Sequence, residues 1–356
     1  MNIALFLPNW VGDAVMATPA IRAVRQHFAG ARLVAVLKPY VAGVFEGAPW
    51  FDQLFFLDSR GPWSQRWFAI AARLRREGID LALLFPNSFR SALVAWSGRC
   101  RRRVGYARYG RGFLLTDRLS PPRDRLGRIP PHPVLLAYNR LAQWIGCPQP
   151  SLRMELFTTA ADEAAADRLW DEAGLATFAE AVALNPGAAY GSAKLWPAEY
   201  FALLARRLAV ERGSGVLVLC GPSERDLARR IVAEARHPAV RSLADAPVSL
   251  GLTKACLKRV DLLITTDSGP RHFATAFGRP VITLFGPTHI AWTETYHPWA
   301  VHLQKPVSCG PCQLRRCPMD HRCMTTLRPD EVFRVAAHLL QRWAEARGVG
   351  VPRATG

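Results

Sequence analysis

Alternation of apolar strand-like runs with helical patterns constrains the fold of this chain more than any other feature. Short apolar runs at residues 2–8, 32–38 and 181–184 have the composition of buried strands, and helical patterns such as 13–28 and 198–210 separate them. Strands that alternate with helices form parallel sheets with right-handed crossovers. The pattern therefore predicts an α/β protein.

The alternation is interrupted at residues 147–159, which contain Pro148 and Pro150 and lack a strong period. A chain of 356 residues is long enough for two ordinary domains. We therefore expect two Rossmann-like domains, over residues 1–155 and 160–345. Ligands of open α/β sheets bind beyond the carboxyl ends of the strands, so functional residues should follow the strands directly.

The loop after the first strand carries the first candidate, Asp13, near the start of a helix. An Asp at this place most often caps the helix, and the sequence alone favours that interpretation. The alternative is a carboxylate that points into a cleft and acts as a general base. The loop contains no G-x-G-x-x-G pattern, so a dinucleotide site in this half is not expected.

Two loops of the second half contain candidates for binding a phosphate or a ribose. Residues 185–197 form a glycine-containing loop with Lys194, and backbone amides with an ammonium can cradle a phosphate, although the P-loop spacing is absent. This stretch could equally be a plain surface loop. Glu224 follows another apolar strand and suits ribose hydroxyls, or it is a first-turn Glu that favours the helix dipole.

The segment around Asp267 is the most informative part of the sequence. A strand-like run delivers Asp267 and Ser268 to a turn, and a helix is predicted to start at Gly269 and the Pro that follows. Free amides at such a helix start bind a diphosphate, and His272 lies within the first turn. Thr288 follows the next strand, at the same predicted sheet edge. Together these loops predict nucleotide binding.

Four of the eight cysteines crowd into one stretch with the spacing C-x₂-C-x₄-C-x₅-C, at Cys309, Cys312, Cys317 and Cys323. Four nearby thiols can bind structural Zn²⁺, although zinc sites usually place two C-x₂-C pairs farther apart. The alternative is reduced thiols in a compact loop, because stable disulfides are not expected in the cytosol.

These motifs resemble the ADP-heptose:lipopolysaccharide heptosyltransferases of glycosyltransferase family nine, over nearly the whole chain. The resemblance is carried by six short segments, which are Asn9–Asp13, Thr18–Ala20, Asn185–Ala188, Lys194–Pro197, Asp267–His272 and Phe285–Thr288. The cysteine-rich stretch is similar to that of the heptosyltransferase II branch.

The resemblance implies a GT-B fold, in which the parallel sheets of two Rossmann-like domains face a central cleft. It implies an inverting transfer of heptose from ADP-heptose to the lipopolysaccharide inner core, as the second heptose, onto heptosyl-Kdo-lipid A. Asp13 would be the general base and Lys194 would neutralise the leaving ADP. The amides of Ser268 and Gly269, with His272 and Thr288, would help to hold the donor. By the same resemblance Asp267 would bind heptose hydroxyls and Glu224 the ribose, with no cofactor required.

The formal charge of +18, from 46 Lys and Arg against 28 Asp and Glu, predicts an acidic partner. The lipopolysaccharide acceptor implied by the resemblance is an anionic membrane-anchored glycolipid. An arginine-rich stretch could bind it or the membrane surface, through Arg99, Arg101, Arg102 and Arg103. The alternative is a solvated basic face. No apolar run is long enough for a membrane span and the N-terminus lacks a signal-peptide pattern. We therefore expect a cytoplasmic protein, peripheral at the inner membrane.

Two other functions stay open at this stage. One is a family-nine transferase of another sugar, or one that acts at another core position. The other is a nucleic-acid-binding protein, suggested by the basic charge. The sequence contains no recognisable nucleic-acid reader motif, and nucleic acid binding would leave the turn at Asp267 unexplained. We therefore expect no nucleic acid partner.

Overall fold

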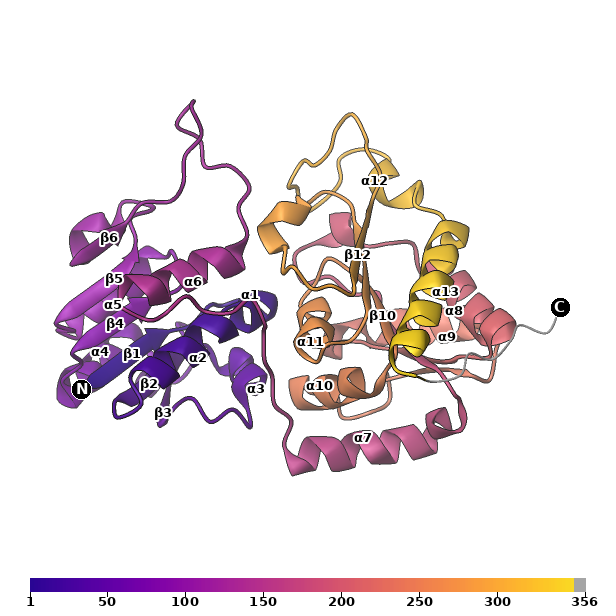
Figure 1. The fold of residues 1–356 in the computed structure, drawn as a ribbon, viewed down its shortest axis with the longest axis horizontal. Coiled ribbons are helices and arrows are strands. Elements are labelled where there is room, and N and C mark those ends of the chain that lie inside the picture. The colour runs from indigo at the N-terminus through magenta and orange to yellow at the C-terminus, as the bar shows by residue number, and fades with distance from the viewer. Residues whose placement is uncertain (349–356) are drawn as a thin grey trace. The chain divides into compact units, whose positions relative to one another are not determined.

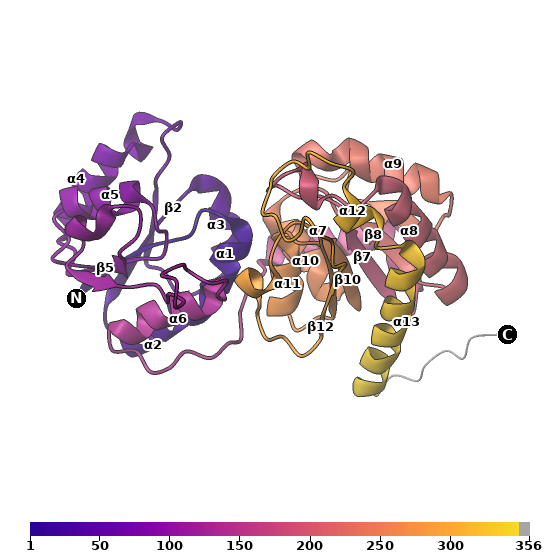
Figure 2. The ribbon, with the colours of Figure 1, turned by 90° about the horizontal axis from the view of Figure 1, so that it is seen from above.

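The computed structural model describes residues 1–348, which divide into two α/β units (Figures 1 and 2). The first unit consists of Met1–Phe157 together with the short segment Ala291–Thr295, and the second consists of the other described residues. The division between Phe157 and Thr158 falls inside the interval that the sequence leaves between the two expected domains.

The first unit is built on a six-stranded sheet with the order β3-β2-β1-β4-β5-β6, in which every neighbouring pair is parallel. Its strands are β1 (Asn2–Phe6), β2 (Arg32–Leu37), β3 (Gln53–Phe56), β4 (Leu81–Leu84), β5 (Arg102–Tyr106) and β6 (Asp117–Leu119). Its helices are α1 (Val11–Met16), α2 (Thr18–His27), α3 (Ala42–Phe45), α4 (Trp67–Glu77), α5 (Phe89–Ser97) and α6 (Val134–Trp144). Helices α4 and α5 pack together on one face of this sheet, and α2 packs with α6 on the other (Figure 2).

The second unit repeats this arrangement with the order β12-β11-β10-β7-β8-β9, again entirely parallel. Its strands are β7 (Ala181–Asn185), β8 (Gly215–Val218), β9 (Val240–Ser242), β10 (Leu262–Thr266), β11 (Val281–Phe285) and β12 (Ala300–Gln304). Its helices are α7 (Ala160–Glu172), α8 (Ala198–Arg212), α9 (Arg225–Ala235), α10 (Leu250–Arg259), α11 (Pro270–Ala276), α12 (Arg322–Thr325) and α13 (Pro329–Ala346). Helices α8, α9 and α13 pack in one layer, whereas α7, α10 and α11 form another (Figure 1).

The central strands are buried on both faces, which explains why their sequences are continuous apolar runs and not alternating ones. In β1 the side chains of Ala4 and Phe6 join the cluster that packs under α4 and α5, while Ile3 and Leu5 face the opposite helices. All five residues of β7, β10 and β11 are buried. Both expected sheets and their parallel sense are confirmed.

The segment 147–159, expected to link the domains, instead packs on the first unit for most of its length. Met154 and Leu156 are buried. The backbone amide of Glu155 donates a hydrogen bond of 3.0 Å to the hydroxyl of Thr18. Prolines break the helical pattern here, and residues 148–149 and 151–153 are exposed, but the backbone is held to the first unit by the side chains of Thr18 and Arg22 of α2. No helix among residues 1–348 is both long enough and apolar enough to cross a membrane.

Candidate functional site

Each sheet has one place where the strand order reverses direction, and the candidate residues gather at those two places. In the first unit the reversal lies between β1 and β4, and in the second between β7 and β10. At such a point the two following loops diverge to opposite sides of the sheet and leave a crevice for a ligand. Asp13 follows β1, whereas Lys194 and Asp267 follow β7 and β10.

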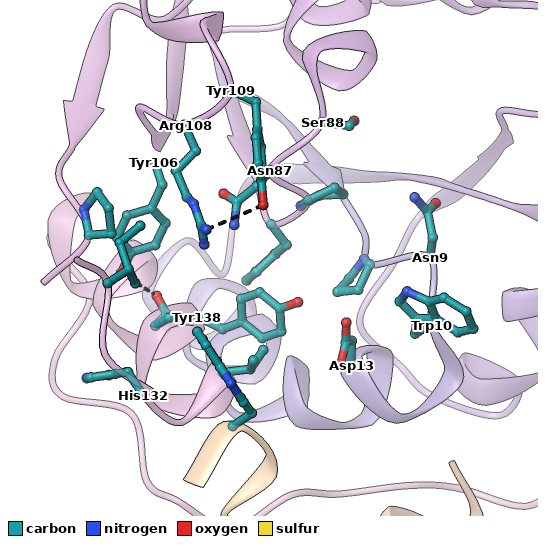
Figure 3. Close-up of a pocket in the computed structure, with 18 of the residues that line it drawn as sticks. Asn9, Trp10, Asp13, Asn87, Ser88, Tyr106, Arg108, Tyr109, His132 and Tyr138 are labelled. Carbon is teal, nitrogen blue, oxygen red and sulfur yellow. Dashed lines mark hydrogen bonds between the residues drawn. The ribbon is translucent and has the colours of Figure 1, made fainter. Parts of the chain in front are cut away.

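The crevice of the first unit opens into a pocket of about 410 Å³ (Figure 3). Its wall is built from the loop after β1, the loop after β4, the end of β5 and the start of α6. The polar and aromatic side chains on this wall include Asn9, Trp10, Asp13, Asn87, Ser88, Tyr106, Arg108, Tyr109, His132 and Tyr138, with Phe85 and Trp292 as further aromatic residues. The size suits a sugar residue, and carboxylate, amide, hydroxyl and guanidinium groups converge on it.

Asp13 occupies the third position of α1 and lines this pocket. The N-cap residue of α1 is Trp10, so the interpretation of Asp13 as the helix cap is wrong. Figure 3 places the Asp13 carboxylate between Tyr138 and Trp10. Burial raises the pKa of Tyr138 well above its usual value, and the negative charge of Asp13 raises it further. Tyr138 therefore stays a neutral phenol beside the carboxylate.

The opposite wall of the pocket carries positive charge. The Arg108 guanidinium lines the pocket and donates to the hydroxyl of Tyr109 at 3.4 Å (Figure 3). The pocket thus contains one carboxylate on α1 and a cation after β5. An acceptor with a hydroxyl near Asp13 and a negative group near Arg108 would match both.

In the second unit the loops after β7, β10 and β11 meet at the Asp267 side chain. The Lys194 ammonium donates to one carboxylate oxygen at 2.5 Å and to the Asp267 carbonyl at 3.0 Å. Thr288 donates to the same carboxylate oxygen at 2.8 Å, and Arg271 donates to the other at 3.2 Å. The structure therefore brings three predicted residues, Lys194, Asp267 and Thr288, into one network.

Charge and burial in this network fix the protonation states. Burial raises the pKa of Asp267, but the nearby charges of Lys194 and Arg271 and the hydrogen bonds from Lys194 and Thr288 outweigh it and lower this pKa to about 2. Burial, followed by repulsion from Arg271, lowers the pKa of His272 well below its usual value. Asp267 is therefore ionised and His272 neutral near pH 7. No described residue hydrogen-bonds the buried His272 Nδ1.

Further hydrogen bonds tie the donor-side loops together. The Asn185 amide donates to the hydroxyls of Thr265 at 2.9 Å and Ser268 at 2.8 Å, which fixes Ser268 beside the end of β7. The Glu224 carboxylate accepts from the Gly221 amide and packs against Gly187 so closely that a Cβ there would lie 2.0 Å from it. Glu224, which follows β8, thus packs against the loop after β7.

Zinc binding by the cysteine-rich stretch stays a prediction, and the geometry of the described residues gives it no support. Among residues 1–348 no group of three or more His, Cys, Asp or Glu side chains is arranged to hold a metal ion. All four thiols are free: Cys309 and Cys312 are exposed, Cys317 is half-buried, and Cys323, a residue of helix α12, is buried. Burial raises the pKa of Cys323, and the nearby thiols of Cys317, Cys309 and Cys312 raise it further, so the four cysteines lie in one neighbourhood.

Contacts of other residues attach the cysteine-rich loop to the donor side. The Tyr190 hydroxyl donates to the Gln313 carbonyl at 2.7 Å, and the Ala193 amide donates to the Arg315 carbonyl at 3.1 Å. The Arg315 guanidinium lies 5.3 Å from the centre of the Tyr190 ring. The loop therefore supports the segment that carries Lys194.

The candidate arginines Arg99, Arg101, Arg102 and Arg103 do not belong to the acceptor pocket. They lie at the amino end of β5, whereas the pocket lies at the carboxyl ends of the strands. Arg102 forms a 2.8 Å ion pair with Asp117, and Arg101 forms one of 3.2 Å with Asp80. The expectation that these arginines bind the acceptor is therefore wrong for this pocket. The direction of β5 carries them to the opposite edge of the sheet.

Comparison with known proteins decides the family. Residues 67–322, more than half of the chain, match glycosyltransferase family 9 (heptosyltransferase). The chain belongs to this family. It is therefore a glycosyltransferase, and the resemblance noted in its motifs is confirmed.

Similar proteins cover almost the whole of this family-nine glycosyltransferase. Lipooligosaccharide heptosyltransferase 2 of Campylobacter jejuni is 27% identical over 345 residues, which are 94% of this chain and 97% of that protein. ADP-heptose lipopolysaccharide heptosyltransferase II of E. coli matches in structure with a TM-score of 0.78 at 23% identity, covering 96% of this chain and 99% of that one. E. coli heptosyltransferase WaaC with ADP-2-deoxy-2-fluoro heptose matches with a TM-score of 0.69 at 16% identity, over 95% and 99%. The GT-B fold class is thereby confirmed.

Sequence reasoning missed several residues of this glycosyltransferase. Asn87 and Ser88 follow β4 directly, so the rule that placed Asp267 could also have found them. Tyr138 lies on an apolar helix face and does not follow a strand, so the same rule could not have found it. Arg271, next to Asp267 in the network, resembles an ordinary first-turn helix residue until the fold turns it inward.

Proposed function

We propose that this protein transfers heptose from ADP-heptose to the inner core of lipopolysaccharide with inversion, and that the acceptor is heptosyl-Kdo-lipid A. The observation that carries the proposal is the carboxylate of Asp13 in the sugar-sized pocket at the β1/β4 reversal. The names of the relatives support the sugar, because they are heptosyltransferases of the second type. WaaC with an ADP-heptose analogue supports the nucleotide.

Asp13 acts as the general base in this proposal. It accepts the proton of the acceptor hydroxyl while that oxygen attacks the anomeric carbon of the donor. The bond from the anomeric carbon to the phosphate oxygen breaks at the same time, and ADP leaves with the electron pair. A single in-line displacement inverts the configuration and needs no covalent intermediate. Tyr138, held neutral beside Asp13, orients the carboxylate and does not compete for the proton.

Lys194 and its neighbours take up the charge that develops on ADP. The ammonium is preorganised by Asp267, so little reorganisation is required when the phosphate becomes more negative. A neutral His272 with an open Nδ1 can exchange a hydrogen bond with a phosphate oxygen without a second charge. The Ser268 and Gly269 amides and the Thr288 hydroxyl complete the predicted donor contacts, and Glu224 binds the ribose.

Asp267 has a second role in the proposal besides contact with heptose hydroxyls. Its two carboxylate oxygens already accept from Lys194, Thr288 and Arg271. We assign it mainly to positioning Lys194, with a heptose hydroxyl as an additional donor to the same oxygens. An ionised carboxylate has lone pairs for both.

The protein acts at the cytoplasmic face of the inner membrane in this proposal, because its acceptor is anchored there. Arg99 and Arg101 are exposed at the amino edge of the first sheet and can reach anionic headgroups. Sedimentation with vesicles of phosphatidylglycerol and phosphatidylethanolamine tests this location. Binding that falls in the Arg99→Ser/Arg101→Ser variant supports it, and equal binding by that variant rejects these residues.

Product analysis tests the transfer itself. Purified protein is incubated with ADP-heptose and with acceptors that carry either one heptose or none. The masses of the glycolipid products are then measured by mass spectrometry. Addition of one heptose to the heptosylated acceptor alone is expected. Addition to the acceptor without heptose, or transfer from another ADP-sugar only, identifies a different member of the family. In a thermal-shift assay ADP should stabilise the protein and DNA should not.

A further inference from the structure

A second cavity, of about 320 Å³, lies on the other side of the β4–α5 loop from the Asp13 pocket. It is formed by the carboxyl ends of β1 and β2, by the residue after β3, and by the start of α5. Asn9, Pro86 and Ser88 line both cavities and form the partition between them. The two cavities therefore flank one reversal point and can receive two parts of a single branched ligand.

The ionisable side chains that line this second cavity are both cations, Lys38 and Arg90. No other residue of 1–348 forms an ion pair with either one. The acid closest in sequence to the cavity wall is Asp58, and its carboxylate accepts from the Arg60 amide instead. Ser59 and Asn9 add neutral hydrogen-bonding groups to the wall. The lining thus has the composition of an oxyanion site.

A third positive charge lies directly beneath the partition. Arg111 is 0% exposed, and its guanidinium donates to the Pro86 and Ser88 carbonyls and, at 3.2 Å, to the Asn87 side chain. None of its partners among the described residues is a carboxylate. Burial, with a contribution from Arg108, lowers its pKa to about 10, so it remains charged near pH 7. A buried uncompensated cation strengthens the attraction of both cavities for an anion, because the low local dielectric screens it weakly.

We propose that the cavity lined by Lys38 and Arg90 is a second subsite for the acceptor, which binds an oxyanion, either phosphate or carboxylate, while the reacting hydroxyl lies at Asp13. The proposal rests on the proposed function, since it assigns the second cavity to the same acceptor. Lys38 and Arg90 contact the oxyanion directly. Arg111 is a positioning residue: it holds the partition loop and adds charge without reaching the ligand. The subsite fixes which hydroxyl of a branched anionic acceptor reaches the base.

Binding of simple anions tests the site without any reaction. Protein labelled with ¹⁵N is titrated with inorganic phosphate and, separately, with acetate, and the amide signals of Asn9 and Ser88 are followed. We expect both signals to move in the wild type and in Arg76→Met, an exposed arginine of α4 that serves as control. They should stay fixed in Lys38→Met/Arg90→Met. The proposal is overturned if neither anion shifts these amide signals, or if the signals shift as much in the double variant as in the wild type.

Kinetics with ADP-heptose tests the same site in turnover. Lys38→Met and Arg90→Met should each raise KM for the acceptor about tenfold, with kcat and KM for the donor within about twofold. Phosphatase-treated and carboxyl-reduced acceptors identify the anion, because the variants lose their defect on the acceptor that lacks it. An unchanged acceptor KM in the double variant overturns the subsite. If the wild-type protein transfers no heptose, the proposed function is overturned instead. The anion titration then decides whether Lys38 and Arg90 form an oxyanion site.

Discussion

The ammonium of Lys194 lies 2.5 Å from the carboxylate of Asp267, although the two residues come from loops after different strands, β7 and β10. Both side chains are almost fully buried, and Asp267 is only 5% exposed. The pair therefore lies at the reversal point between β7 and β10, and it fixes the Lys194 ammonium there. Removing either partner leaves a buried charge without its counterpart, which is costly.

Lys194→Met should lower kcat by about 10²–10³-fold, because the leaving ADP loses its preorganised cation. The matched control is Lys258→Met, which removes an ammonium paired with Glu163 on the surface of the same unit. Steady-state kinetics with varied ADP-heptose measures both. If the Lys194 variant retains kcat and changes only its melting temperature, the ammonium has a structural role and not a role in the reaction.

Asp13→Asn should lower kcat by about 10²–10⁴-fold while ADP binding stays unchanged, because the amide cannot accept the hydroxyl proton. Calorimetric titration with ADP provides the binding measurement. Tyr138→Phe keeps the ring in the pocket and removes the hydroxyl beside Asp13, so it should reduce kcat by a smaller factor, about tenfold. Full turnover by the Asp13 variant would remove this residue as the base.

Gly187→Ala should weaken donor binding by acting through Glu224. A Cβ at this position would lie 2.0 Å from the Glu224 carboxylate, so the carboxylate must move away from the loop after β7. Because both substitutions then remove the same contact, Gly187→Ala/Glu224→Ala should bind ADP-heptose no more weakly than Glu224→Ala alone. Additive losses in calorimetry would show that the two residues act independently.

The free energy of unfolding should fall as the pH drops below about 6.5, in part because of His272. The folded pKa of this residue is well below its unfolded value, so in this range the unfolded chain binds a proton that the native protein does not. The slope from one such group is at most ~1.4 kcal/mol per pH unit. Urea unfolding of His272→Asn at several pH values should show a shallower slope than the wild type.

One control variant accompanies that measurement, and two other groups contribute to the pH dependence of the unfolding free energy. His338→Asn replaces an exposed histidine of α13 and should leave the slope unchanged. His297 also has a pKa lowered by burial, so part of the slope will persist in the His272 variant. Asp267 contributes outside this range, because its stabilisation is lost only as the pH falls from its unfolded value of about 3.8 toward 2. Identical slopes for wild type and His272→Asn would contradict the assignment of a buried neutral imidazole.

Removal of metal should leave the reaction unchanged. The described residues offer no cluster of metal ligands, and the proposed chemistry uses Asp13 and Lys194 instead. Dialysis against EDTA should keep the transfer rate within about twofold of the untreated protein. Elemental analysis of the same sample should find much less than one zinc per chain. Loss of activity that Zn²⁺ or Mg²⁺ restores would refute this expectation.

The parts of this protein that could be predicted from sequence are those determined by local pattern. Buried strands such as β11 are continuous apolar runs, and Pro270 marks the start of α11. Strand β5 was not predicted, because its first residues are the charged Arg102 and Arg103, which emerge at the solvent-exposed amino edge of the sheet.

The remaining site residues depend on tertiary packing that no local pattern encodes. Arg111 belongs to an arginine-rich stretch that suggests a solvated surface, yet the fold buries it beneath the loop after β4. Tyr138 is one of several buried positions of α6, and only the approach of α1 places Asp13 beside it. Loops that follow strands can therefore be found from sequence, whereas side chains that reach them from other elements cannot.

The attachment of the cysteine-rich loop to Tyr190 and Ala193 has a practical consequence. Cys309 faces solvent on a loop whose other residues hold the chain that carries Lys194. In a Cys312→Ser variant, which removes the second exposed thiol of this loop, a fluorescent dye coupled to Cys309 would lie outside the predicted nucleotide contacts but on the loop that supports Lys194. The emission of such a dye would register the arrival of the nucleotide in real time, which turns an unused thiol into a sensor of occupancy.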